Sequence, residues 1–173
     1  YCTAVGSATG TGTASDPFDN LDDVLKVPAN INAGDIIYVD AGTYNAYAIV
    51  VPSTLSLNEG MAIMDDNVSI IGAGMGVTVF YNNDGGNNSG KGLFLSVNAN
   101  GFTLKDLTVD SYDNETNNGL GVTPVGGQAI NIGNLVDNLT NILLDGVAVI
   151  NSGNPQSGAS QSAVSIAEGA QVV

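Results

Sequence analysis

The sequence predicts an all-β solenoid, in which successive turns of the chain stack and bury their apolar faces against one another. Three segments share one pattern, a short run of alternating aliphatic residues broken by Asp or Gly: 67–72, 101–111 and 141–151. Matching Leu104 to Leu144 requires a shift of about 40 residues, and matching Ile70 to Leu104 a shift of about 34. Imperfect recurrence at this spacing is typical of a solenoid.

Short strand-like runs continue from residue 36 to the end of the chain, and no helical pattern separates them. This arrangement does not suit alternating strands and helices. An antiparallel sandwich also contains regular short strands and is the competing fold. A kink between two short runs, at Leu104 and Leu107 and again at Leu144 and Val147, favours the solenoid because it would turn a corner between adjacent sheets.

A helix is predicted just before the first strand. Ser15 or Asp16 can cap it, Pro17 suits its first position, and Pro28 ends it. Four apolar residues then share one helical face: Phe18, Leu21, Val24 and Leu25. Such a helix would cover the open apolar end of a stack of strands.

The balance of charged residues excludes two classes of binding partner. Seventeen acidic residues against three lysines give a net charge of −14, which repels nucleic acid and anionic membranes. No apolar run approaches the roughly 20 residues that span a bilayer. A low content of charged residues (12%) together with many Asn, Gly, Ser and Thr is typical of exported surface proteins. In addition, Tyr1 follows no Met. We therefore expect a bacterial extracellular or cell-surface protein, exported through a cleaved signal peptide.

The single cysteine, Cys2, cannot form an internal disulfide. It is expected to be a free thiol, and the alternative is a bridge to a partner or to another part of a longer chain.

Two segments carry a family resemblance. Residues 10–18 and 33–44 resemble the N-terminal signature of right-handed parallel β-helix proteins of the pectin-lyase-like superfamily, and residues 68–74 and 102–109 resemble successive coils of that group. The resemblance implies a right-handed, single-stranded parallel β-helix with three parallel sheets per turn. It also implies inward aliphatic ladders and Asn or Gly at the corners.

The chain then divides into an N-terminal segment with its capping α-helix, residues 1–34, and β-helix coils over residues 35–173 that we expect to continue in a longer chain. The run at residues 36–39 is apolar on both sides, so either Ile36 and Tyr38 or Ile37 and Val39 face inward. The other inward candidates are Ile70, Leu104, Leu107, Val109, Ile130, Ile132, Leu144, Val147 and Val149.

The resemblance implies that an enzyme of this group would use carboxylates, often with Ca²⁺, and usually Arg or Lys as base or as partner for a uronate. The chain has neither Arg nor His. Lys105 is the one lysine within a coil, and neighbouring Asp106 opposes the lowered pKa that a base needs. The repeat alignment places Lys105 opposite Asp145, which predicts a structural ion pair between turns. No convincing catalytic dyad results, and the sequence favours a non-catalytic protein.

Two polar inserts, at residues 82–90 and 112–119, offer binding residues. Asp110, Asp113 and Glu115 supply hard oxygen ligands within one loop and predict a calcium site, although no cofactor is required. An exposed tyrosine would stack against sugars, and the candidates are Tyr44, Tyr47, Tyr81 and Tyr112. Tyr81 and Tyr112 are preferred because they border the inserts, and Asp84 lies within the first of them.

These observations predict the non-catalytic N-terminal part of a large exported cell-surface β-helix protein, adhesin-like or glycan-binding. Its expected partners are extracellular polysaccharide, cell-surface or secretion components, and the remainder of its own longer chain. Two alternatives stay open: the N-terminal region of a secreted polysaccharide lyase or glycoside hydrolase whose active site lies in later coils, and a structural spacer module.

Overall fold

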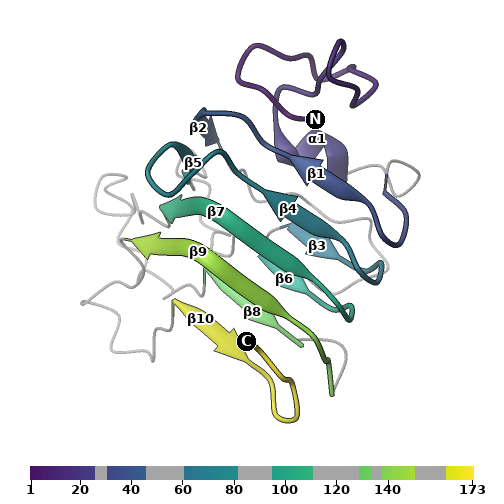
Figure 1. The fold of residues 1–173 in the computed structure, drawn as a ribbon, viewed down its shortest axis with the longest axis vertical. Helices are drawn as coiled ribbons and strands as arrows, with labels where there is room; N and C mark the ends of the chain where they lie inside the picture. Colours follow the sequence, from purple (N-terminus) through teal and green to yellow (C-terminus); the bar gives the residue numbers. More distant parts are fainter. Residues whose placement is uncertain (26–30, 46–60, 82–94, 111–128, 134–137, 151–162) are drawn as a thin grey trace, which may run out of the picture.

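The computed structural model describes residues 1–25, 31–45, 61–81, 95–110, 129–133, 138–150 and 163–173. Within them lie one short helix and ten strands, which stack one turn upon the next from the N-terminal to the C-terminal end (Figure 1). The elements are α1 (Leu21–Leu25), β1 (Ile36–Tyr38), β2 (Gly42–Asn45), β3 (Met61–Ile63), β4 (Ser69–Ile71), β5 (Thr78–Tyr81), β6 (Leu95–Val97), β7 (Thr103–Asp110), β8 (Ile130–Ile132), β9 (Leu143–Ile150) and β10 (Val164–Ile166).

All pairings between these strands are parallel, and they form three faces around the coil. Face A contains β1, β4 and the first halves of β7 and β9. Face B contains β2, β5 and the second halves of β7 and β9. Face C contains β3, β6, β8 and β10. Because β7 and β9 run without a break through two faces, faces A and B form one continuous hydrogen-bonded sheet.

The strand register confirms the repeat in the sequence. Ile37 pairs with Ile70, Ile70 with Leu104, and Leu104 with Leu144, so one column of aliphatic side chains runs through four turns. Val109 likewise pairs with Val149. The solenoid is therefore correct, and the antiparallel sandwich is wrong because the paired strands run in the same direction.

At residues 36–39 the inward-facing pair is Ile37 and Val39. Ile37 and Val39 are 5% and 2% exposed, whereas Ile36 and Tyr38 are 52% and 43% exposed. Of the other inward candidates, six are fully buried and three pack half-buried against the core. The six are Ile70, Leu104, Leu107, Val109, Ile130 and Ile132, and the three are Leu144, Val147 and Val149.

The corner before face A repeats a left-handed backbone in every turn. Gly34, Asn67, Gly101 and Asn141 have φ values of 89°, 62°, 69° and 59°. Glycine and asparagine are the residues that adopt this conformation at least cost. Their neighbours bond from turn to turn, because Asp66 Oδ1 accepts from Asn100 N–H at 2.8 Å and Asn100 Oδ1 accepts from Thr140 N–H at 3.0 Å. This confirms the corner residues that the resemblance implied.

The corner between faces A and B differs between turns. β7 and β9 each bend through this corner at a single residue. This residue is Asp106 in β7, with φ 55°, and Gly146 in β9, with φ 61°. The second turn uses a loop from Gly72 to Val77 instead. Its backbone is held by bonds from Gly72 N–H to Lys105 O and from Gly74 N–H to Asp106 O, both at 2.8 Å.

The N-terminal helix begins later than the sequence predicts, and its predicted end at Pro28 lies outside the described residues. It begins at Leu21, where Asn20 Oδ1 accepts the Leu21 N–H at 2.8 Å, so Ser15, Asp16 and Pro17 do not start it. Phe18 instead forms a parallel bridge with Cys2, which itself bridges to Val39. The pairing of Phe18 with Cys2 at the N-terminal end of the stack therefore outweighs the local sequence preference for a helix that starts near Pro17. Leu21 and Val24 are buried as expected, and α1 lies at the N-terminal end of the stack (Figure 1).

Cys2 forms no disulfide and has no exposed surface, and its Sγ lies 3.7 Å from Asn20 O. Burial of the sulfur fits the free thiol and disfavours a bridge to a partner.

Candidate functional site

Among the described coil residues the lysine is Lys105, and it forms an ion pair. Lys105 Nζ lies 2.8 Å from Asp145 Oδ2 across the β7–β9 pair, as the repeat alignment predicts. The hydrogen bond and the charge of Asp145, followed by the charge of Asp106, raise the pKa of Lys105 above its ordinary value. A general base at this position would need the opposite shift.

One row of residues lies at the end of face B, where β2, β5, β7 and β9 end. Tyr81 pairs with Asn45 on one side and with Asp110 on the other, and Asp110 pairs with Ile150. Tyr81 and Asp110 follow the buried residues Phe80 and Val109, and alternation along a strand therefore turns both toward the outer face. We call these two residues the strand-end pair.

The strand-end pair brings together a tyrosine and an acid that the sequence singles out separately. Adjacent parallel strands lie about 4.8 Å apart, so a ligand on the outer face would contact both side chains. Both side chains are partly buried. An aromatic ring beside a carboxylate offers a surface for an apolar sugar face and an acceptor for sugar hydroxyl groups.

The other predicted ligands, Asp84, Tyr112, Asp113 and Glu115, lie outside the described residues, as does Tyr47. Within the described part of the chain, no three His, Cys, Asp or Glu side chains gather as a metal site would require. Because only Asp110 of the three proposed ligands lies in this part of the chain, the calcium site stays a prediction.

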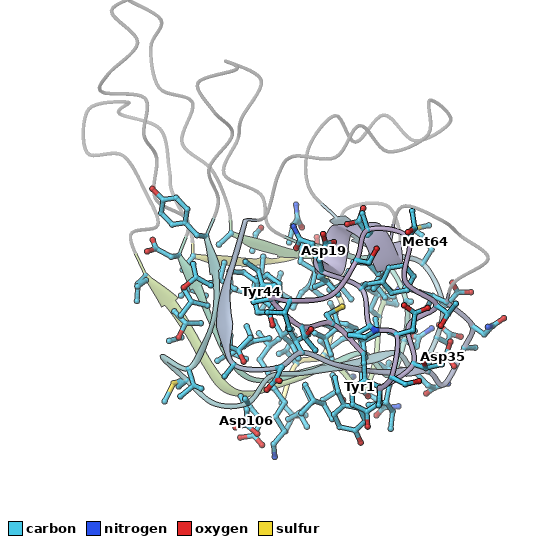
Figure 2. All side chains as sticks on the ribbon, turned by 90° about the horizontal axis from the view of Figure 1, so that it is seen from above. Tyr1, Asp19, Asp35, Tyr44, Met64 and Asp106 are labelled. Atoms are coloured by element: carbon cyan, nitrogen blue, oxygen red, sulfur yellow. The ribbon has the colours of Figure 1, made fainter. Side chains whose placement is uncertain are left out.

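Tyr44 is not a sugar platform. It is 2% exposed, its ring lies 5.3 Å from that of Phe80, and its hydroxyl donates to Asp40 O at 3.1 Å. Figure 2 shows Tyr44 inside the coil and Asp106 outside it. Burial, and then the negative charge of Asp40, raises the pKa of Tyr44 to about 12.

This pKa predicts alkaline instability. Below pH 10 the phenol is protonated in both states, and between pH 10 and about 12 only the unfolded chain loses the proton, so the stability falls there. We expect Tyr44→Phe to cost about 1 kcal/mol at pH 7 through the lost hydrogen bond and to fall less steeply above pH 10. Urea unfolding of both proteins at pH 7 and pH 11 measures this, and equal losses at pH 11 would contradict it.

Sequence reasoning missed an aromatic pair on the outside of face A. The rings of Tyr1 and Tyr38 stack with centroids 5.4 Å apart and planes at 29°. Both rings are partly exposed, and Ile36 is exposed beside them. Whether Tyr38 points inward or outward depends on which alternate residues of β1 face the core. Because residues 36–39 are all apolar, the sequence does not decide this, and no sequence signal could identify the pair.

Among the described residues, no helix is long and apolar enough to cross a membrane.

No protein-family model matches the chain, and no curated protein matches it either. Its structure is similar to that of a rhamnogalacturonan lyase, with a TM-score of 0.61 and 21% sequence identity. The match covers 86% of this chain and 35% of the lyase, so the chain spans about a third of the length of that protein. At this identity the likeness establishes the fold alone, and the chain is a parallel β-helix.

Proposed function

We propose that this chain is a non-catalytic, glycan-binding part of an exported cell-surface β-helix protein. The observation that carries the proposal is the strand-end pair, in which the register of β5 and β7 sets Tyr81 beside Asp110 on the outer face. The strands that hold the two residues are anchored by the buried side chains of Phe80 and Val109, so the pair is held on a rigid support.

The charge of the chain indicates the class of glycan. A net charge of −14 with no Arg and no His disfavours uronate polymers, which are themselves anionic. The strand-end pair also offers a carboxylate, which accepts hydrogen bonds from neutral hydroxyl groups and repels other carboxylates. We therefore expect a neutral polysaccharide as the ligand.

Two features support a non-catalytic role. The sequence lacks the Arg and His that commonly act as anion clamp and proton shuttle. Lys105, the lysine in the part of the coils that the structure describes, is paired with Asp145, and its pKa is shifted away from that of a base.

The alternative is the N-terminal region of a secreted polysaccharide lyase or glycoside hydrolase. The structural similarity to a rhamnogalacturonan lyase over about a third of that protein favours it. In that case the catalytic residues belong to later coils and not to residues 1–173.

Glycan binding tests the proposal. On an array of neutral and uronate polysaccharides we expect the chain to bind neutral members, because the strand-end pair offers stacking and hydroxyl acceptors. Tyr81→Ala removes the ring and should weaken binding about 5- to 30-fold, since one stacked ring contributes about 1–2 kcal/mol. Asp110→Asn should weaken the same ligands.

The matched control is Tyr38→Ala, which removes a partly exposed tyrosine from face A. Its binding should equal that of the unmodified chain. Equal losses in Tyr38→Ala and Tyr81→Ala would refute a site at the strand-end pair, and uronate-only binding would refute the neutral ligand.

Calcium provides a separate prediction. If Asp110, Asp113 and Glu115 hold Ca²⁺, 1 mM calcium (about 100 times a Kd near 10 µM) should stabilise the fold by about 3 kcal/mol relative to chelator. Melting temperatures with calcium and with chelator measure this. The shift should disappear in Asp113→Asn, and equal melting temperatures in the unmodified chain would remove the proposed site.

A further inference from the structure

The row at the end of face B continues past the strand-end pair to Ile150. Ile150 is the last residue of β9 and pairs with Asp110, as Asp110 pairs with Tyr81. The three residues therefore lie on three successive strands, β5, β7 and β9, which follow one another along the stack (Figure 1). Ile150 has the opposite parity to the core residue Val149 and is 44% exposed, so its side chain lies on the outer face. The row offers an aromatic ring, a carboxylate and an aliphatic side chain in that order.

The neighbouring row on face B is covered by a loop. Thr108, two residues before Asp110, is 5% exposed, and its Oγ1 accepts from Gly76 N–H at 2.9 Å. The loop from Gly72 to Val77 therefore lies over the outer face of β7 at this position. A ligand on the strand-end pair would meet this loop if it extended back along β7, whereas the row leads it from one turn to the next. The described surface favours a ligand whose long axis follows the stack.

The spacing of the row suits a straight glycan chain. Adjacent parallel strands lie about 4.8 Å apart, so Tyr81 and Ile150 lie about 10 Å apart along the row. A β-1,4-linked chain of pyranose sugars is straight, because its linking bonds are equatorial, and each sugar advances it by about one ring length. That advance is close to the spacing of the strands, so successive sugars can contact successive turns. An α-1,4-linked chain of glucose curves and would leave the row.

We propose that this row binds a neutral β-1,4-linked glycan along the stack, with one sugar on each turn. The ring of Tyr81 would stack against the first sugar, and Asp110 would accept hydrogen bonds from hydroxyl groups of the second. Ile150 would contact the apolar face of the third sugar. This orientation rests on the proposed glycan binding, and it adds to that function the type of linkage and a third contact residue.

The first test compares trisaccharides that differ in linkage. The probes are the β-1,4-linked trioses of glucose, mannose and xylose, and maltotriose is the control because it contains the same three glucose units as cellotriose. In calorimetric titrations of the unmodified chain we expect at least one β-1,4-linked triose to bind at least about tenfold more tightly than maltotriose. Equal affinity for maltotriose, or no binding of any β-1,4-linked triose, overturns the proposal.

The second test locates the third sugar. Ile150→Ala should weaken binding of the β-1,4-linked triose about fivefold and change binding of the matching disaccharide by less than about twofold, because two sugars reach only Tyr81 and Asp110. The matched control is Ile36→Ala, which removes a similarly exposed isoleucine (52%) from the outside of face A and should bind both sugars normally. Equal losses for the triose and the disaccharide, or equal losses in the two variants, refute the contact with Ile150.

The two proposals for face B can fail separately. If neutral glycans bind and Tyr81→Ala weakens them, but linkage and Ile150→Ala make no difference, the glycan-binding function stands and the orientation along the stack is wrong. If no neutral glycan binds, both are wrong.

Discussion

Replacing Leu104 by Ala is expected to lower the free energy of unfolding by about 2–5 kcal/mol. Leu104 is fully buried and pairs with Ile70 on one side and Leu144 on the other. The variant would leave a cavity in the middle of the inward column, where each turn has only its neighbours to pack against. Urea unfolding measures the loss as a lower midpoint.

Thr103→Ala is the matched control for Leu104→Ala. Thr103 precedes Leu104 on β7 and has the opposite parity, so its side chain faces outward. We expect its effect to stay within about 0.5 kcal/mol. Equal losses in the two variants would mean that the inward and outward faces of β7 are wrongly assigned.

Gly72→Ala is expected to destabilise the fold by about 3 kcal/mol or more. A Cβ at Gly72 would lie only 2.3 Å from Asp106 O and 2.9 Å from Leu107 Cβ. Since the nearest atom belongs to the backbone of the next turn, relief requires the two turns to separate. Thermal unfolding of the variant measures the loss.

Gly76→Ala controls for the backbone strain in the same loop. Gly76 has φ 73°, and a Cβ there would meet nothing within 4 Å. Only the left-handed conformation is then penalised, at about 1–2 kcal/mol. If Gly76→Ala proves as costly as Gly72→Ala, close contact between turns is not what requires glycine at position 72.

The contacts between turns that follow from the repeat could be predicted from the sequence. The Leu104–Leu144 and Val109–Val149 pairs and the Lys105–Asp145 ion pair all follow from one shift of 40 residues, because β7 and β9 turn their corner in the same way.

Two features escape this reasoning because they depend on contacts between distant segments. The shift is 34 between Ile70 and Leu104 but 29 between Tyr81 and Asp110, since the loop after Gly72 adds five residues to the second turn. Aligning the repeats at Ile70 therefore does not pair Tyr81 with Asp110. The sequence predicts that the helix begins near Pro17. This is wrong for a similar reason, because Phe18 pairs with Cys2 at the end of the stack.

We propose that the chain binds a glycan at the strand-end pair without cleaving it. The most direct measurement incubates the chain with each polysaccharide it binds, and with uronate polymers, and follows new reducing ends and unsaturated products over time. We expect binding that Tyr81→Ala weakens and no product above a heat-denatured control. Product formation that is lost in Lys105→Met or Asp110→Asn would contradict this proposal and place a catalytic site within these coils.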